Sequence, residues 1–122
     1  MTLKNKLEIF LITYNRIDNL KETFNQILAK NSPIRDFNIT VVDNRSDDGS
    51  SELIEEYRKN FPNIKHVINN RNIGGNANAV RAYELSTYEY VWVLCDDDAY
   101  DFSHWDEVED AIINKKSDGI IV

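Results

Sequence analysis

Three consecutive aspartates, Asp96, Asp97 and Asp98, follow an apolar stretch in "YVWVLCDDDAY", residues 90–100. Two unit charges about 4 Å apart repel by about 4 kcal/mol at an effective dielectric constant near 20, so these carboxylates need full solvation, a shared proton or a cation. If strand geometry persists, Asp96 and Asp98 face one way and Asp97 faces the other. Carboxylates without His or Cys select Mg²⁺, Mn²⁺ or Ca²⁺ rather than zinc, and suit a metal that also holds substrate phosphates. The pattern favours a metal site over a solvated turn.

A second polar segment, "NNRNIGGNANAVR", covers residues 69–81. The paired Gly74 and Gly75 allow a close backbone approach, and the helix predicted after them offers free N–H groups. Arg71 and Arg81 add positive charge. These features fit a loop that faces a diphosphate, although Asn/Gly clusters also form ordinary turns.

Two more polar segments follow apolar runs. Asp43 and Asn44 stand at the end of the run 38–43, where their side chains can hydrogen-bond a base or a ribose. "TYNR", residues 13–16, follows the run 8–13. His66 and His104 lack a partnered acid or a nucleophile in the sequence pattern, and we assign them no role.

The elements that must position these segments alternate between strand and helix patterns. Continuous apolar runs, typical of strands buried on both faces of a parallel sheet, occupy residues 8–13, 38–43, 64–68, 90–95 and 119–122. Residues at helical spacing lie between them: Leu20, Phe24, Ile27 and Leu28, then Leu53, Ile54, Tyr57 and Phe61, then the segments 76–86 and 105–115.

Helix starts and inward faces follow from the same patterns. Asp18 or Asn19 is predicted to cap the first helix. Asp47 or Asp48, with Ser50, is predicted to start the second, and Gly49 eases the turn before it. In the third helix, the inward residues are predicted to be Ala77, Val80 and Leu85.

The alternation predicts an α/β fold, a Rossmann-like, doubly wound and mainly parallel sheet within a single domain, residues 1–122. Ligands bind such sheets in the crevice outside the carboxyl ends of the strands. All four polar segments fall at those ends, which predicts one shared site.

Several function classes are excluded by what is missing. "TYNRIDN" contains no glycine, which argues against a dinucleotide fingerprint, and neither a P-loop nor a GxSxG elbow occurs. A net charge of −7 argues against a nucleic-acid partner. The single cysteine, Cys95, allows no internal disulfide, and no apolar segment approaches the roughly 20 residues needed to cross a bilayer. We therefore expect a cytoplasmic protein with no membrane segment in this chain.

The four segments together resemble the N-terminal half of the GT-A glycosyltransferases of inverting family 2. "IFLITYNR", "VVDNRSDDGS", "NRNIGGNANAVR" and "WVLCDDDAY" are similar, in that order, to the family's TYN segment, D-[DN]-x-S-x-D-G-[ST] segment, Asn/Gly loop and DxD motif. The resemblance covers essentially the whole chain.

The resemblance implies a nucleoside-diphosphate-sugar donor, a glycan or lipid-linked acceptor, and a Mn²⁺ or Mg²⁺ ion. The residues implied around the base and ribose are Thr13, Tyr14, Asn15, Asp43 and Asn44. Those implied toward the sugar diphosphate are Arg71, Asn72, Gly75, Asn76 and Arg81. Asp96, Asp97 and Asp98 would hold the metal, with Asp97 and Asp98 competing as its main ligand.

Some features depart from the family pattern. Ile12 stands where a proline is common and Arg45 where a glycine is common, so the base-binding loop is expected to differ in shape. The family's general base and acceptor site lie after the fifth strand, so they are expected beyond Val122, and the chain is expected to be the donor-binding part of a longer catalytic domain. A nucleotidyltransferase-like protein and a non-enzymatic nucleotide-binding module are the alternatives.

Overall fold

The computed structural model describes residues 3–96, 100 and 102–113. In chain order the elements are a 3₁₀ turn η1 (Leu3–Asn5), β1 (Leu7–Thr13), α1 (Ile17–Ile27), β2 (Ile39–Asp43), α2 (Ser50–Asn60), β3 (Ile64–Ile68), α3 (Gly75–Leu85), β4 (Tyr90–Cys95) and α4 (Trp105–Ile113). The first four predicted strands and the four predicted helices are confirmed. The fifth predicted strand, 119–122, lies outside the described residues, as do Asp97 and Asp98.

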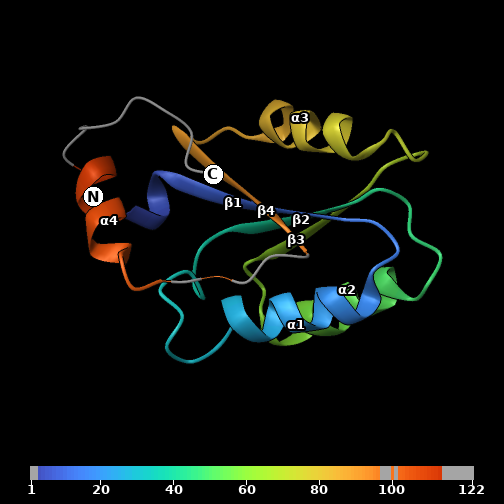
Figure 1. Ribbon diagram of the computed structural model, residues 1–122, viewed down its shortest axis with the longest axis horizontal. Helices are drawn as coiled ribbons and strands as arrows, with labels where there is room; N and C mark the ends of the chain where they lie inside the picture. The colour runs from blue at the N-terminus through green and yellow to red at the C-terminus, as the bar shows by residue number, and fades with distance from the viewer. Residues whose placement is uncertain (1–2, 97–99, 101, 114–122) are drawn as a thin grey trace.

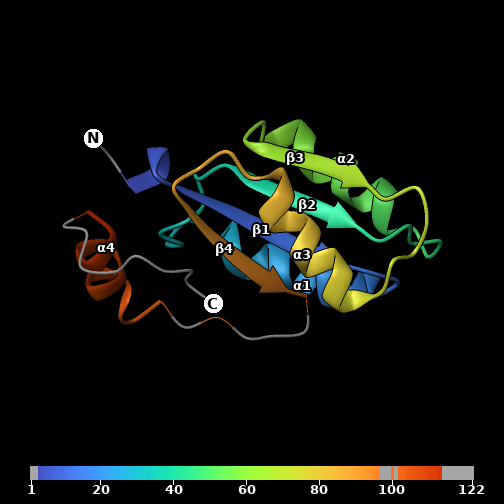
Figure 2. The same ribbon diagram turned by 90° about the horizontal axis from the view of Figure 1, so that it is seen from above.

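The four strands form one parallel sheet in the order β3-β2-β1-β4 (Figure 2). Helices α1 and α2 lie on one face and α3 lies on the other (Figure 1). The doubly wound arrangement is therefore confirmed. The register places Thr13 beside Asp43 and Ile12 beside Cys95, so the ends of β1, β2 and β4 meet at one edge.

Each face of the sheet has its own core because side chains alternate along a strand. On the face covered by α1 and α2, fully buried residues include Leu7, Ile9, Leu11, Leu20, Phe24, Ile39 and Ile54. On the opposite face, Phe10, Val42 and Val91 pack against Ala82 of α3. Burial on both faces explains why β1 and β2 are mostly apolar rather than alternating.

The predicted inward face of α3 is wrong. Ala77 and Leu85 are exposed, and Val80 is 54% exposed. Asn78 and Ala82, four residues apart, are the buried side chains instead. The hydrophobic pattern missed this face because one of its members is an amide, whose polar atoms find partners inside the fold.

The predicted cap of α1 is also wrong. The helix begins at Ile17, before Asp18 and Asn19, and its N-cap residue makes no side-chain cap. Asp48 supplies the acceptor: its Oδ2 receives the Ile17 N–H at 3.0 Å. Its Oδ1 receives the Ser50 N–H at 3.1 Å and the Ser50 hydroxyl at 2.6 Å, as expected at the start of α2. One carboxylate thus serves the start of two helices.

Gly49 confirms the predicted turn before α2. Its φ of 96° lies in the left-handed region that glycine enters without strain.

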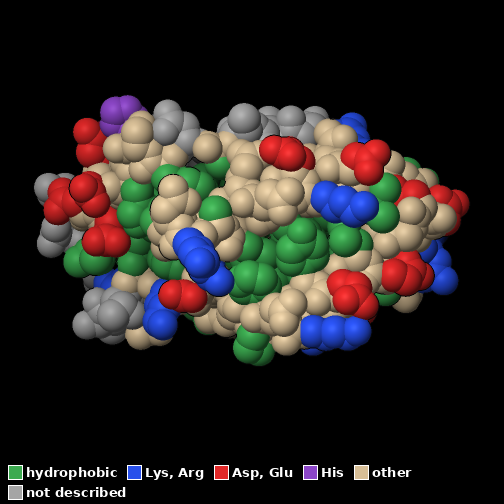
Figure 3. Space-filling model, turned by 90° about the horizontal axis from the view of Figure 1, so that it is seen from below, with side chains coloured by type: hydrophobic (Ala, Val, Ile, Leu, Met, Phe, Trp, Pro, Cys, Tyr) green, Lys and Arg blue, Asp and Glu red, His purple; other side chains and the backbone are tan. Residues whose placement is uncertain are grey.

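The face formed by α1 and α2 carries apolar side chains along its middle, bordered by acidic and basic groups (Figure 3). Tyr57 of α2 packs on Phe24 of α1 with ring centroids 4.4 Å apart. Helix α4 is joined to the sheet by stacking of Trp105 on Trp92 at 6.0 Å. In the described part of the chain no helix is long and apolar enough to cross a membrane.

Candidate functional site

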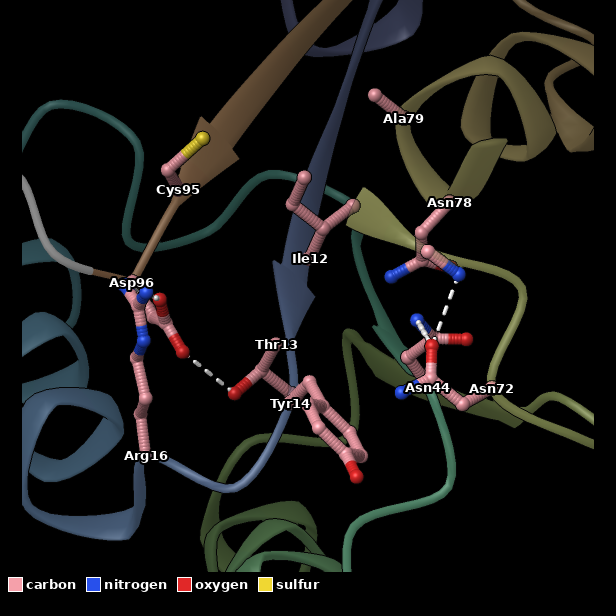
Figure 4. A pocket seen from close by; sticks show the side chains of 11 residues that line it. Ile12, Thr13, Tyr14, Arg16, Asn44, Asn72, Asn78, Ala79, Cys95 and Asp96 are labelled. Carbon is pink, nitrogen blue, oxygen red and sulfur yellow. Dashed lines mark hydrogen bonds and ion pairs between the residues drawn. The ribbon is translucent and has the colours of Figure 1, made fainter. Parts of the chain in front are cut away.

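A cavity of about 520 Å³ opens at the carboxyl ends of the strands (Figure 4). The residues that line it are Ile12, Thr13, Tyr14, Arg16, Asn44, Asn72, Gly74, Asn78, Ala79, Cys95 and Asp96. The fold therefore brings together residues as far apart in the sequence as Ile12 and Asp96, as a doubly wound sheet requires.

One side of the cavity is built around a buried carboxylate. Asp96 is 6% exposed, and its Oδ2 accepts the Thr13 hydroxyl at 2.7 Å. The Arg16 Nη1 lies 3.6 Å from the other carboxylate oxygen. We call Thr13, Arg16 and Asp96 the acidic wall. In the acidic wall, the Asp96 carboxylate contacts the neutral hydroxyl of Thr13 and the half-exposed guanidinium of Arg16.

The acidic wall supplies hard oxygen, the ligand type that Mg²⁺ and Mn²⁺ prefer. No three His, Cys, Asp or Glu side chains gather within metal-binding reach in the ranges 3–96 and 102–113. Asp96 is the described member of the predicted set, and both of its oxygens already face protein groups. The described residues fit a metal in chemistry but do not complete a metal site.

The other side of the cavity is built from amides. Asn44 Nδ2 donates to Asn72 Oδ1 at 2.6 Å, and Asn44 Oδ1 accepts from Asn69 Nδ2 and from the Ile73 N–H. Asn69 Nδ2 also reaches Asn78 Oδ1 at 2.8 Å, and Asn78 Nδ2 donates to the Val42 carbonyl. We call Asn44, Asn69, Asn72 and Asn78 the amide network.

The amide network ties the loop after β3 to the end of β2. Asn72 Oδ1 also accepts the Gly74 N–H at 2.8 Å, which fixes the approach to α3. Sequence reasoning named Asn44 and Asn72 but missed Asn69 and Asn78. The density of asparagine in residues 69–78 was the available signal, but it does not reveal which amides turn inward.

Asp43 and Asn44 share a strand end but differ in environment. Asn44 lines the cavity, while Asp43 is 1% exposed and does not. Asp43 Oδ1 accepts the Ser46 N–H at 2.9 Å and the Ser46 hydroxyl at 2.7 Å. Asp43 thus shapes the loop that follows β2.

That loop is joined to the segment after β1. The Asn15 N–H donates to Ser46 Oγ at 2.8 Å, and Asn15 Oδ1 accepts the Asp47 N–H at 2.7 Å. Arg45 has a φ of 67°, so it adopts the left-handed conformation that the family's glycine would enter without strain.

The remaining predicted residues lie in α3 or in the loop before it. Gly75 is the first residue of α3, and Asn76 follows it. Arg71 is exposed, and Arg81 has a buried Nε without a hydrogen-bond partner in the described part of the chain. Neither arginine lines the cavity.

Known proteins are similar to this chain in sequence and in architecture. The profile of glycosyl transferase family 2 matches residues 8–122. The abequosyltransferase RfbV of Salmonella typhimurium is 36% identical over 89 residues, which are 71% of this chain and 26% of that protein.

Solved structures confirm the GT-A fold. Staphylococcus aureus TarS 1-349, in complex with UDP-GlcNAc, matches with a TM-score of 0.73 and 24% identity over 92% of this chain and 32% of that one. A mannosyltransferase of Pyrobaculum calidifontis, in complex with GDP-Man and Mn²⁺, matches with a TM-score of 0.65 and 21% identity over 75% of this chain and 27% of that one.

The chain spans about a quarter to a third of the length of these relatives. The profile match nevertheless covers nearly the whole chain, and it includes all four polar segments that meet at the cavity or beside it. The chain therefore belongs to glycosyl transferase family 2.

Proposed function

We propose that the protein containing this chain transfers a sugar from a nucleoside-diphosphate-sugar donor to a glycan or lipid-linked acceptor, with inversion at the anomeric carbon and with help from Mn²⁺ or Mg²⁺. The observation that supports this best is the cavity between the acidic wall and the amide network. Its volume of about 520 Å³ suits a ligand of nucleotide-sugar size.

Binding of the base and ribose is proposed for the β1 and β2 ends. Tyr14 is 42% exposed at the cavity and offers a ring face on which a base can stack. Neutral hydroxyl and amide groups suit the edges of a base or the hydroxyls of a ribose. The proposed set is Thr13, Tyr14, Asn15, Asp43 and Asn44. Asp43 and Asn15 act through the loop they hold, because neither lines the cavity.

Binding of the diphosphate is proposed for the start of α3. The first N–H groups of a helix have no partner within the helix and attract anions. The proposed set is Arg71, Asn72, Gly75, Asn76 and Arg81. Arg71 is exposed near this loop and supplies a cation that can reach outward to a bound phosphate.

A divalent metal is proposed at Asp96, Asp97 and Asp98. When bound there, the metal would neutralise charge on the departing nucleoside diphosphate. The similar mannosyltransferase was solved in complex with GDP-Man and Mn²⁺, which supports this assignment. Deprotonation of the acceptor hydroxyl requires a general base, a role that we assign to none of the described residues.

Isothermal titration calorimetry tests the donor site. UDP, GDP and dTDP are each titrated into the chain with Mn²⁺, with Mg²⁺ and with a chelator. We expect one nucleotide to bind with metal and to bind at least about tenfold more weakly with the chelator. Asp96→Asn should reduce the metal effect, whereas the matched control Asp36→Asn, on an exposed aspartate, should not. A folded chain that binds none of the three with metal would overturn the proposal.

The same titrations separate the alternatives. A non-enzymatic nucleotide-binding module that needs no metal would bind equally well with the chelator and as Asp96→Asn. The family match favours glycosyl transfer over nucleotidyl transfer, which needs a Gly-rich, basic loop after β1 that "TYNRIDN" does not provide.

A further inference from the structure

His66 of β3 lies behind the donor cavity, between two carboxylates. Its side chain is 5% exposed. Its Nδ1 is 2.8 Å from Glu55 Oε2 of α2, and its Nε2 is 4.0 Å from Asp43 Oδ2 at the end of β2. The ring therefore connects the surface of α2 with the carboxylate that shapes the loop after β2.

The contact with Glu55 fixes one ring proton. Hydrogen bonds from His66 and then from Arg58 outweigh desolvation and lower the pKa of the Glu55 carboxyl, so this group is a carboxylate at neutral pH. A carboxylate only accepts hydrogen bonds, so Nδ1 must carry a hydrogen. In a neutral ring Nε2 is then a bare acceptor.

In the neutral ring, no hydrogen lies between His66 Nε2 and Asp43 Oδ2. A bare Nε2 would face the acceptor Oδ2 of Asp43. Both atoms are buried and have no hydrogen-bond partner in the described part of the chain. Buried polar atoms are rarely left unpaired, because each costs about 1–3 kcal/mol. One added proton on Nε2 makes the ring a cation and turns two opposed acceptors into an ion pair across 4.0 Å.

The charges around the ring favour that proton. Helix α2 contributes Glu55, which is paired with Arg58 at 3.0 Å, and β2 contributes Asp43. On β3 itself, Lys65 is exposed and alternates to the other face. In the loop after β2, the Arg45 guanidinium donates to the Asn69 carbonyl. Two carboxylates, those of Glu55 and Asp43, thus face the His66 ring, and the guanidinium of Arg58 contacts the first of them.

We propose that a proton on His66 Nε2, which pairs the charged ring with Asp43 Oδ2 across 4.0 Å, makes His66 a positioning residue for nucleotide binding. The proton holds Asp43, whose other oxygen holds Ser46, and Ser46 Oγ accepts the Asn15 N–H. The Asp43 carbonyl also accepts the N–H of Asn69, a member of the amide network. The Asp43 carboxylate therefore positions the segment after β1, and the Asp43 backbone carbonyl contacts the amide network. This inference rests on the proposed function.

Nucleotide affinity as a function of pH tests the positioning role. The nucleotide that binds best in the calorimetric test is titrated from about pH 5.5 to about pH 8.5, the range in which histidine usually changes charge. We expect affinity to fall as the pH rises. His66→Gln should bind about tenfold more weakly at the acidic end and should lack the part of the pH dependence that comes from the ring.

A matched control separates the ring from the nucleotide's own titration. His104 is the second histidine, with a side chain 77% exposed, and His104→Gln should keep the wild-type profile. Identical pH profiles for wild type and His66→Gln would overturn the positioning role, even if both proteins bind nucleotide.

Nuclear magnetic resonance of the ring nitrogens tests the proton on Nε2 without nucleotide. We expect both ring nitrogens of His66 to carry hydrogen in the folded wild type. Asp43→Asn, whose amide can donate to Nε2, should leave hydrogen on Nδ1 alone. A ring without a proton on Nε2 throughout the pH range would mean that a water molecule satisfies both acceptors, and would overturn the proposal. If no nucleotide binds, the positioning role fails with the proposed function, while these spectra still decide the proton.

Discussion

The two sides of the cavity hold buried polar groups in different ways. The acidic wall buries one carboxylate, Asp96, against a hydroxyl and a half-exposed arginine. The amide network buries neutral groups, three of whose members, Asn44, Asn69 and Asn78, are at most 3% exposed. Both lie at the carboxyl ends of parallel strands that are neighbours in the sheet.

The difference follows from what each group can donate and accept. An amide does both, so amides can satisfy one another without a counter-charge. A carboxylate only accepts, and it needs donors or cations that come from elsewhere. The amide network is therefore expected to be the rigid side of the cavity. The acidic wall is expected to respond to salt, pH and metal, as a site that takes up an ion should.

Asn44→Ala is expected to have the largest effect on stability among the variants that test this difference. It removes the acceptor for Asn69 and Ile73 and the donor for Asn72, and it leaves buried groups unpaired. We expect the free energy of unfolding to fall by about 3 kcal/mol, measured by urea unfolding. Asn19→Ala, on an exposed asparagine of α1, should change it by less than about 0.5 kcal/mol. Equal losses would show that the hydrogen bonds of Asn44 do not stabilise the fold.

Thr13→Val tests whether the stability of the protein depends on the hydroxyl donor of the acidic wall as strongly as on Asn44 of the amide network. The change preserves shape but removes the hydroxyl that donates to Asp96 Oδ2. The expected loss is about 2 kcal/mol of unfolding free energy, because the acceptor is charged and buried. Thr13→Ser keeps the hydroxyl and should recover most of that loss. A loss with Ser as large as with Val would assign the effect to packing.

Asp48→Ala tests the loop between β2 and α2. The variant loses the acceptor at the start of α1 and of α2, so about 1–2 kcal/mol of unfolding free energy should be lost. Desolvation raises the pKa of Asp48, but hydrogen bonds from Ser50 and Ile17 outweigh it and lower the pKa below the usual 3.8.

A pKa lowered by folding stabilises the protein above the unfolded value, and that contribution is lost as the pH falls through the folded value. The stability of the wild type should therefore drop more steeply below about pH 4 than that of Asp48→Asn, as measured by urea unfolding at a series of pH values. Parallel pH curves would contradict the assignment.

Arg16→Gln should have the smallest effect and sharpens the contrast in salt dependence. The guanidinium is half exposed and 3.6 Å from Asp96, so its removal should cost less than about 1 kcal/mol. Most of that difference should disappear in about 1 M salt, where screening is strong. The loss caused by Asn44→Ala should persist there. A salt-independent effect of Arg16→Gln would mean that packing of its stem matters more than charge.

The strand positions were predictable within one or two residues because each strand is rich in apolar residues and is followed by polar residues. Residues 8–13 and 90–95 became Leu7–Thr13 and Tyr90–Cys95. Helix α3 shows the limit of hydrophobic patterns. A buried amide carries no hydrophobic signal, so Asn78 was missed and the exposed Val80 was chosen in its place.

By itself the sequence determined that four polar segments follow four apolar runs, and hence that a ligand site lies at one edge of a parallel sheet. This is local information, because the length and composition of a run fix where a strand ends. Only the tertiary structure decided which polar side chains contact one another. Asp48 caps a helix that begins 31 residues earlier, Asn69 bonds Asn44 across 25 residues, and His66 meets Asp43 from the neighbouring strand. Hydrogen bonds of this kind depend on the direction of single polar atoms in space, which no spacing along the chain records.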